Sequence, residues 1–163
     1  MDNKPIDLST AGIRLGYAYE TVAGTRPSTY INIFNPKSTP DFNPEPNSLD
    51  ITSLNDTEFK RYMNGLKDLG GSLSFTIGMS QSLLDTWNTM CDTTKANEST
   101  GKRTWFILYH PGLDKSFGFV GEPSKLGFPE ASVDAVWDAT VYIAPRDEIG
   151  WYTAVNPTDP VSA

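Results

Sequence analysis

The sequence predicts a mainly β protein, with an antiparallel β-sandwich or barrel-like fold, one packed α-helix, a long Pro-rich loop and arms at both ends. Three observations predict it. Runs of alternating apolar and polar residues recur along the chain. The 13 glycines and 12 prolines mostly fall between these runs and indicate turns. Helical periodicity occurs in one segment. At 163 residues, we expect a single domain over residues 1–163.

Charge and composition narrow the classes of function. The net charge is −7, from 20 acidic and 13 basic residues, and Lys and Arg form no long cluster. Tight binding of nucleic acid is therefore not expected. An acidic surface that lines a passage for nucleic acid remains an alternative, because it would repel a polyanion and keep it from binding to the wall. Cys91 is the single cysteine, which rules out an internal disulfide framework and indicates a reducing compartment.

Neither a signal peptide nor a membrane span is predicted. The N-terminal sequence MDNKPIDLST has no apolar core. No run approaches the roughly 18 apolar residues of a span. We therefore expect a soluble protein that is made in the cytoplasm and does not insert into a membrane.

The N-terminal part predicts an arm, two strands and a loop. Residues 1–11 have no period and predict an arm. Residues 12–20 alternate and residues 28–34 are β-rich, so both predict strands. Residues 35–47 hold four prolines and three asparagines. Because Pro lacks the ladder donor, this segment is predicted to be a long loop rather than a central strand.

A charged connection separates the next two predicted strands. Residues 48–54 place Leu49 and Ile51 on one face, and residues 71–77 alternate apolar residues with Ser and Thr. Both patterns predict antiparallel sheet with one apolar face. Gly70 and Gly71 precede a strand rather than a helix N-terminus, so they predict a tight turn.

The predicted helix spans residues 80–96, and we expect it to cover a sheet. Ser82, followed three residues later by Asp85, fits the pattern of a capping box. The apolar stripe consists of Leu83, Leu84, Trp87, Met90 and Cys91.

Three strands are predicted in the last part of the chain, at residues 104–109, 116–121 and 131–144. In the third strand, apolar residues occur at every second position from Val133 to Ile143 and therefore lie on one face. Pro145 is expected to end this strand. Residues 145–163 have no sustained period and predict a C-terminal arm.

No catalytic or metal-binding constellation is visible. His110 and Cys91, each the only one of its type, cannot form a His/Cys metal cluster, and we expect no cofactor. His110 precedes a Pro-Gly turn and is interpreted as a hairpin-end residue. Cys91 is interpreted as a small buried hydrophobe, with a reactive thiol as the alternative. A catalytic pair of carboxylates, as in glycosidases, remains an alternative.

Aromatic residues leave a carbohydrate-binding module as another alternative. Trp105 and Trp137 lie on alternating apolar faces and are interpreted as core residues. Trp151 and Tyr152, in the predicted C-terminal arm, have no core explanation. Residues of this kind normally dock on their own domain or on a neighbouring subunit.

Residues 49–75, LDITSLNDTEFKRYMNGLKDLGGSLSF, resemble a pattern of the major tail tube proteins of long, non-contractile-tailed bacteriophages. There, a strand ending in a hydroxyl and a small polar residue leads into Asp-Thr, an aromatic or basic stretch, GLKD and a Gly before the next strand. The order of the other parts of the chain is similar too. The matching residues are Thr52, Ser53, Asp56, Thr57, Arg61, Tyr62, Gly65, Leu66, Lys67, Asp68 and Gly70.

The resemblance implies a structural virion protein that is not an enzyme. Such subunits form homohexameric rings that stack into the tail tube, and DNA leaves through an acidic channel without specific binding. The long loop and the termini bridge successive rings. The implied partners are further copies, the tape measure protein, the tail terminator and tail-tip or distal tail proteins. The runner-up is a tube protein of a contractile tail or of a secretion or injection apparatus.

Two sets of candidate residues follow. A rigid, charged connection suits a surface that must meet a neighbouring subunit in one register. Because the long loop is expected to bridge successive rings, deleting residues 35–47 is expected to leave a folded monomer that cannot stack. The candidate lumen-facing acidic residues are Asp50, Asp134 and Asp138. The candidate residues for subunit and ring interfaces are Phe42, Asp56, Arg61, Tyr62, Lys67, Asp68, Trp151 and Tyr152.

Overall fold

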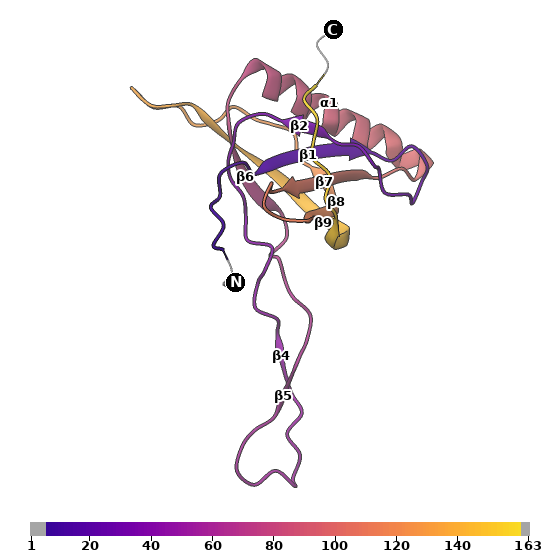
Figure 1. Cartoon of the computed structure of the whole chain (residues 1–163), viewed down its shortest axis with the longest axis vertical. Helices are drawn as coiled ribbons and strands as arrows, with labels where there is room; N and C mark the ends of the chain where they lie inside the picture. The colour runs from indigo at the N-terminus through magenta and orange to yellow at the C-terminus, as the bar shows by residue number, and fades with distance from the viewer. Residues whose placement is uncertain (1–5, 161–163) are drawn as a thin grey trace, which may run out of the picture.

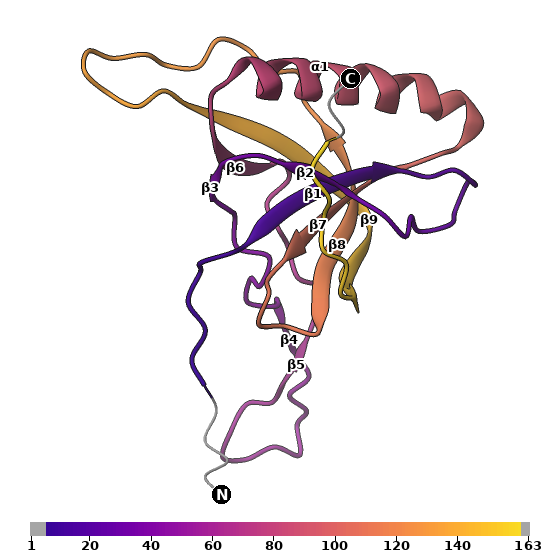
Figure 2. The ribbon, with the colours of Figure 1, turned by 45° about the horizontal axis from the view of Figure 1, so that its top comes forward.

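A computed structural model describes residues 6–160 of the chain. The predicted fold class is confirmed, because these residues form a nearly closed antiparallel sheet and one α-helix (Figure 1). The large sheet has seven strands in the order β2-β1-β7-β8-β9-β6-β3. A two-stranded sheet, β4-β5, extends away from this body (Figure 2).

The elements have the following bounds. The large sheet consists of β1 (Arg14–Tyr19), β2 (Ile31–Ile33), β3 (Pro36–Ser38), β6 (Leu73–Gly78), β7 (Thr104–Tyr109), β8 (Lys115–Pro123) and β9 (Asp138–Thr153). The small sheet consists of β4 (Ser48–Asp50) and β5 (Tyr62–Asn64). Helix α1 (Gln81–Asn97) is followed by a 3-10 turn, η1 (Glu98–Thr100).

The large sheet curls until its two outer strands approach each other. Strand β2 lies at one edge and β3 at the other, yet only Phe34 and Asn35 separate them in sequence. This connection reaches roughly 11 Å at most. Asn35 has a φ of 59°, a left-handed conformation that Asn tolerates. Its carbonyl accepts a hydrogen bond from the Gly78 N–H at 3.0 Å. The turn at Asn35 therefore brings the edges together.

The main core lies between α1 and the inner face of the sheet. Leu83, Trp87 and Met90 pack there with side chains of the strands, as the predicted helical stripe requires. The N-cap of α1 is Ser80, whose Oγ accepts from the Leu83 N–H at 3.1 Å. The predicted capping box at Ser82 is therefore wrong, because the helix has already begun there.

A smaller core lies on the outer face of the sheet. Residues 154–160 run across it, and the Asn32 N–H donates to the Thr158 carbonyl at 2.7 Å. The Thr158 N–H donates in turn to the Tyr30 carbonyl at 2.9 Å. This segment therefore covers the edge of β2. The buried residues of this core are Ala18, Tyr30, Trp105, Ile107 and Val120.

The predicted C-terminal arm is largely wrong. Residues 145–153 continue β9 beside β8, residues 154–160 pack on the body, and residues 161–163 lie outside the described residues. Pro145 does not end the strand, because it faces Gly121 at an irregularity in the register, where the missing N–H is tolerated. A Cβ at Gly121 would lie 2.6 Å from Ile143 Cγ2, so only glycine fits there.

The strand predicted at residues 131–144 begins later than expected. Strand β9 starts at Asp138, and the residues before it form a loop that projects from the body (Figure 1). Asp134 has a φ of 56° and lies outside the β region. Val133 is 97% exposed, and Trp137 is partly exposed rather than in the core. The buried face therefore starts at Ala139.

The predicted loop and strand at residues 35–54 also need correction. The loop contains an edge strand, β3, which pairs with β6. The strand predicted at residues 48–54 ends at Asp50, and Leu49 and Ile51 are exposed instead of facing a core. Deleting residues 35–47 would remove a strand of the body. The expectation that this deletion leaves a folded monomer stays a prediction, and the loss of β3 from the sheet edge counts against it.

A buried carboxylate fixes one end of the sheet. Glu20 is 2% exposed and follows β1. Its oxygens accept from the Arg103 N–H at 2.8 Å, the Arg103 guanidinium at 3.0 Å and Trp105 Nε1 at 3.0 Å. Burial raises the pKa of Glu20, but these hydrogen bonds together outweigh burial and hold the pKa below its usual value. The charged form therefore stabilises the contact between β1 and β7.

We predict that Glu20→Gln lowers the free energy of unfolding by about 2 kcal/mol at neutral pH, because charge-assisted hydrogen bonds are lost. The folded-state pKa of Glu20 is depressed, so its contribution is complete above the unfolded value of about 4.3. It is lost as the pH falls through the folded-state pKa. Urea unfolding of both proteins across this range measures the difference.

Glu122→Gln is the matched control, because Glu122 is exposed and its ion pair with Arg146 is long, at 3.8 Å. We expect this control to unfold like the wild type within about 0.5 kcal/mol. Equal stability of Glu20→Gln and the wild type at neutral pH would contradict the role of Glu20.

Candidate assembly site

The most prominent feature outside the body is a projecting arm, which we define as residues 47–66 (Figure 1). At its base the Asn47 N–H donates to the Leu66 carbonyl at 3.0 Å. Strands β4 and β5 pair from Ser48 with Asn64 to Asp50 with Tyr62. Residues 51–61 form the distal loop. The arm therefore holds itself together by its own hydrogen bonds.

A polar network fixes the distal loop. Asp56 Oδ2 accepts from the Ser53 N–H at 2.9 Å and from Arg61 Nε at 3.0 Å. Thr52 Oγ1 accepts from the Arg61 N–H at 2.8 Å. The Ser53 N–H and the Arg61 side chain lower the pKa of Asp56. Asp56 and Arg61, predicted as interface residues, are therefore brought together and pair with each other.

The apolar side chains of the arm face solvent. Leu54 is fully exposed and Phe59 is 81% exposed, although both are large. Exposed apolar patches of this kind mark interaction sites in soluble proteins. The other large exposed apolar residues of the arm are Leu49, Ile51, Tyr62, Met63 and Leu66.

The segment after the arm returns the chain to the body. Lys67 Nζ donates to Asn43 Oδ1 at 3.2 Å, and Asp68 Oδ1 accepts from the Gly70 N–H at 2.8 Å. Gly70 and Gly71 have φ values of 85° and 89°, so the predicted tight turn is confirmed. Lys67 and Asp68, both predicted as interface residues, therefore make contacts that shape the base of the arm.

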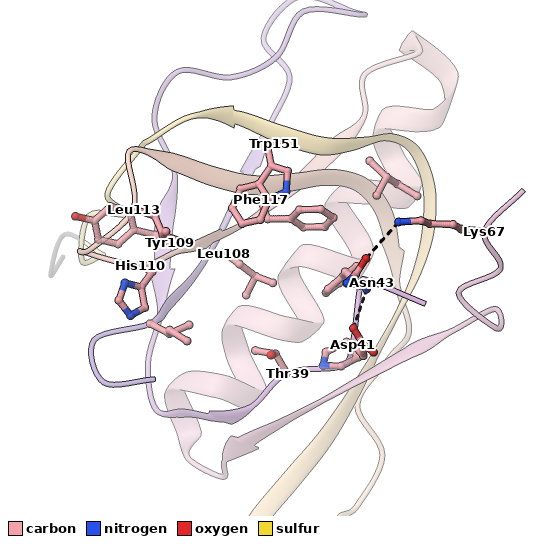
Figure 3. A pocket seen from close by; sticks show the side chains of 14 residues that line it. Thr39, Asp41, Asn43, Lys67, Leu108, Tyr109, His110, Leu113, Phe117 and Trp151 are labelled. Atoms are coloured by element: carbon pink, nitrogen blue, oxygen red, sulfur yellow. Dashed lines mark hydrogen bonds between the residues drawn. The ribbon is translucent and has the colours of Figure 1, made fainter. Parts of the chain in front are cut away.

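A groove with a volume of about 690 Å³ lies beside the base of the arm (Figure 3). Its walls come from the segment before the arm, the β7–β8 turn and the distal part of β9. Asp41, Asn43 and Lys67 lie along one side of it and are joined by hydrogen bonds. The groove is mostly apolar, with walls that include Ile13, Phe42, Leu108, Leu113, Phe117 and Trp151.

His110 lies at the opposite side of the groove, in the β7–β8 turn (Figure 3). Its Nδ1 accepts from the Gly112 N–H at 2.9 Å. Its Nε2 lies 2.6 Å from the Ser9 carbonyl oxygen, to which it donates. The prediction of a hairpin-end residue is confirmed, and both ring nitrogens are engaged.

Three predicted aromatic interface residues lie on the body. The rings of Phe42 and Phe117 are 4.9 Å apart, and Phe42 also packs on Phe119 at 5.1 Å. Phe42 therefore belongs to the edge of the core. Tyr152 packs edge-on against the buried Trp105 at 5.6 Å, whereas Trp151 is largely exposed in the groove.

The three candidate lumen residues do not share a strand face. Asp50 lies on the arm, where hydrogen bonds from Thr52 lower its pKa. Asp134 lies in the projecting loop before β9. Asp138 begins β9 and pairs with Lys37 Nζ at 2.6 Å. Asp134 therefore does not lie on a strand, although the alternating pattern from Val133 onward placed it in one, and the role of the three residues in a channel stays a prediction.

Cys91 is buried on α1, as predicted, and its Sγ donates to the Pro123 carbonyl at 3.7 Å. Burial raises the pKa of its thiol. Within residues 6–160 no three His, Cys, Asp or Glu side chains gather as a possible metal site. In the same range, no helix is long and apolar enough to cross a membrane.

Two features of the structure were not predicted from the sequence. The groove gathers residues from distant parts of the chain, and no local pattern signals it. The projecting loop before β9 exposes Phe128, Val133 and Val136. A signal for this loop was present in Pro129 and Gly127, but the alternation from Val133 onward resembled a strand.

Comparison with models of protein families finds no match to this chain, and comparison with curated proteins finds no relative. Solved structures do share its fold. One is a chain in the cryo-EM structure of the anti-feeding prophage (AFP) baseplate, 6-fold symmetrised. It is 12% identical, the match covers 94% of this chain and 98% of that chain, and the TM-score is 0.52. At this identity the likeness establishes a common fold.

We predict that Phe42→Ala lowers the free energy of unfolding by about 2 to 3 kcal/mol, because its ring packs on the core. Phe59→Ala is the matched control on the arm, with an expected change within about 0.5 kcal/mol. Chemical denaturation of the unassembled subunits measures both. Equal effects of the two substitutions would contradict the assignment of Phe42 to the core.

Proposed function

We propose that this chain is a structural subunit of a phage-type tail tube, which assembles as hexameric rings that stack into a conduit for DNA. The observation that carries the proposal is the arm, which is ordered by its own polar network and exposes its apolar side chains. The fold shared with a chain of a six-fold symmetrised prophage baseplate supports it. The subunit would then be a virion component.

The arm suits a contact with another copy of the chain. A buried apolar side chain contributes about 1.5 to 3 kcal/mol relative to an exposed one. The arm offers several such side chains beyond its own body. It is also held in one shape before binding, which reduces the entropy lost on association. A contact between different surfaces of identical subunits closes into a ring or propagates along an axis.

We further propose that the chain is not an enzyme and that DNA passes it without specific binding. The net charge of −7 supports the second point, because an acidic wall repels a polyanion. The first is supported by His110, whose ring nitrogens are both engaged, and by the buried thiol of Cys91. The proposed partners are further copies, the tape measure protein, the tail terminator and tail-tip proteins.

A second candidate is a tube or ring subunit of a contractile tail or of an injection apparatus. The likeness to a baseplate chain of the anti-feeding prophage favours it specifically. The two candidates differ in what surrounds the tube, while the role of the arm is the same in both. Long open tubes would support a tube subunit, whereas isolated rings would support a baseplate ring.

We predict that purified wild-type protein forms hollow rings or tubes with six-fold end views as its concentration rises. A truncated variant, in which an Asn-Gly turn replaces residues 52–60 between Ile51 and Arg61, should remain monomeric. The Ile51 N–H donates to the Arg61 carbonyl at 3.0 Å, so this hydrogen-bonded pair accepts a two-residue turn. Negative-stain electron microscopy and light scattering on the same samples measure assembly.

Glu58→Gln is the control for the truncation, because it keeps the length and the apolar side chains of the distal loop. It should assemble like the wild type. The truncated body should keep its free energy of unfolding within about 0.5 kcal/mol, since the distal loop lies outside the core. Wild-type protein that stays monomeric even with tail-tip partners, or normal tubes from the truncated variant, would contradict the proposal.

A further inference from the structure

The loop between β8 and β9, residues 124–137, is a second projecting feature and is here named the knob. It extends from the body away from the arm (Figures 1 and 2). Phe128 is 84% exposed and Val133 is 97% exposed, with Val136 also exposed nearby. Three exposed apolar side chains on one loop indicate an interaction site.

The knob is held in one shape. The rings of Phe128 and Trp137 lie 5.2 Å apart, and Trp137 Nε1 donates to the Pro129 carbonyl at 3.4 Å. At its base the Met79 N–H donates to the Trp137 carbonyl at 3.0 Å. Because these contacts exist before binding, docking of the knob would order few additional residues.

The groove beside the arm is the matching cavity on the same chain. Its volume of about 690 Å³ is in the range that receives several side chains. Leu113 and Trp151 in its walls remain exposed. Apolar side chains of the knob would therefore find apolar walls there.

The knob cannot reach the groove of its own copy. Strand β9 begins beside the knob at Asp138, and Ile149 and Trp151 of the same strand line the groove. From Asp138 to Ile149 an extended strand spans roughly 30 Å or more. The two features therefore lie at opposite ends of β9, and only a second copy can bring them together.

Charge favours the same pairing. Glu130 and Asp134 lie in the knob, and within residues 6–160 neither has an ion-pair partner. Lys67 lies at the groove, where its ammonium group donates to the neutral amide of Asn43. The arm carries a different pattern, because Asp56 already pairs with Arg61. Asp41 lines the same side of the groove, so an acidic knob residue gains an opposite charge only where it docks beside Lys67 rather than Asp41.

We propose that the knob of one copy docks in the groove of the next, with Phe128 as the central side chain. This inference rests on the proposed function, which it deepens by naming the surfaces that meet. The contact is heterologous, since knob and groove are different surfaces, so its repetition closes a ring or extends a filament.

Cross-linking between two single variants tests the contact. Val133→Cys protein is mixed with Leu113→Cys protein under assembly conditions and treated with a short bismaleimide, and the linked peptides are identified by mass spectrometry. We expect this adduct to exceed the adduct of Val133→Cys with Leu54→Cys at least about tenfold, because docking raises the effective concentration. Wild-type protein, with its buried Cys91, reports the background.

Phe128→Asp should raise the concentration needed for assembly about tenfold or more, whereas Val22→Asp should assemble nearly like the wild type, because the exposed Val22 lies outside the knob, the groove and the arm. Phe128 and Val22 are both exposed in the subunit, so both variants should fold, and thermal unfolding checks this. Wild-type tubes without the Val133–Leu113 adduct overturn the knob contact and leave the proposed function standing. A Leu54–Leu113 adduct in place of it assigns the groove to a neighbour's arm and also overturns it. Absence of any wild-type assembly overturns both proposals.

Discussion

The connection from β2 to β3 constrains the whole molecule. Phe34 and Asn35 join strands at opposite edges of the seven-stranded sheet, so the sheet must curl until these edges lie side by side. The left-handed Asn35 and its hydrogen bond to Gly78 hold the turn. Curling places one face against α1 and leaves the other for residues 154–160. The core of the body is thereby formed within one chain, and most of the large exposed apolar side chains lie on the arm, the knob and the groove.

The segment that resembles tail tube proteins has a physical meaning in this arrangement. Thr52, Ser53, Asp56 and Arg61 form the network that shapes the distal loop, and Gly70 and Gly71 turn the chain back to the body. The charges of the segment therefore serve mainly to build the arm. In the proposed assembly, contact with a neighbour is left to the apolar side chains that this framework exposes. A polar framework with apolar outer positions gives an interface both a fixed geometry and a driving force.

Much of the fold could be predicted from the sequence, because alternation and helical spacing report on burial. This held for β1, β6, β7 and α1, whose apolar faces meet the core. It failed where tertiary packing decides. Pro145 continues a strand because it lies at an irregularity in the register, and Val133 alternates with its neighbours in a loop that no core covers. The groove could not be predicted either, since Ile13, Leu113 and Trp151 meet only after folding.

The central claim is that the arm is a self-contained element that becomes buried when copies assemble. Hydrogen–deuterium exchange of the same protein, as free subunits and as assembled particles, tests it most directly. In free subunits, amides of residues 48–64 should exchange much faster than those of β7 and β8, because the arm has no core beneath it. In assembled particles the arm should become strongly protected while β7 and β8 change little. An arm whose amide exchange does not slow when the particles assemble would contradict the account.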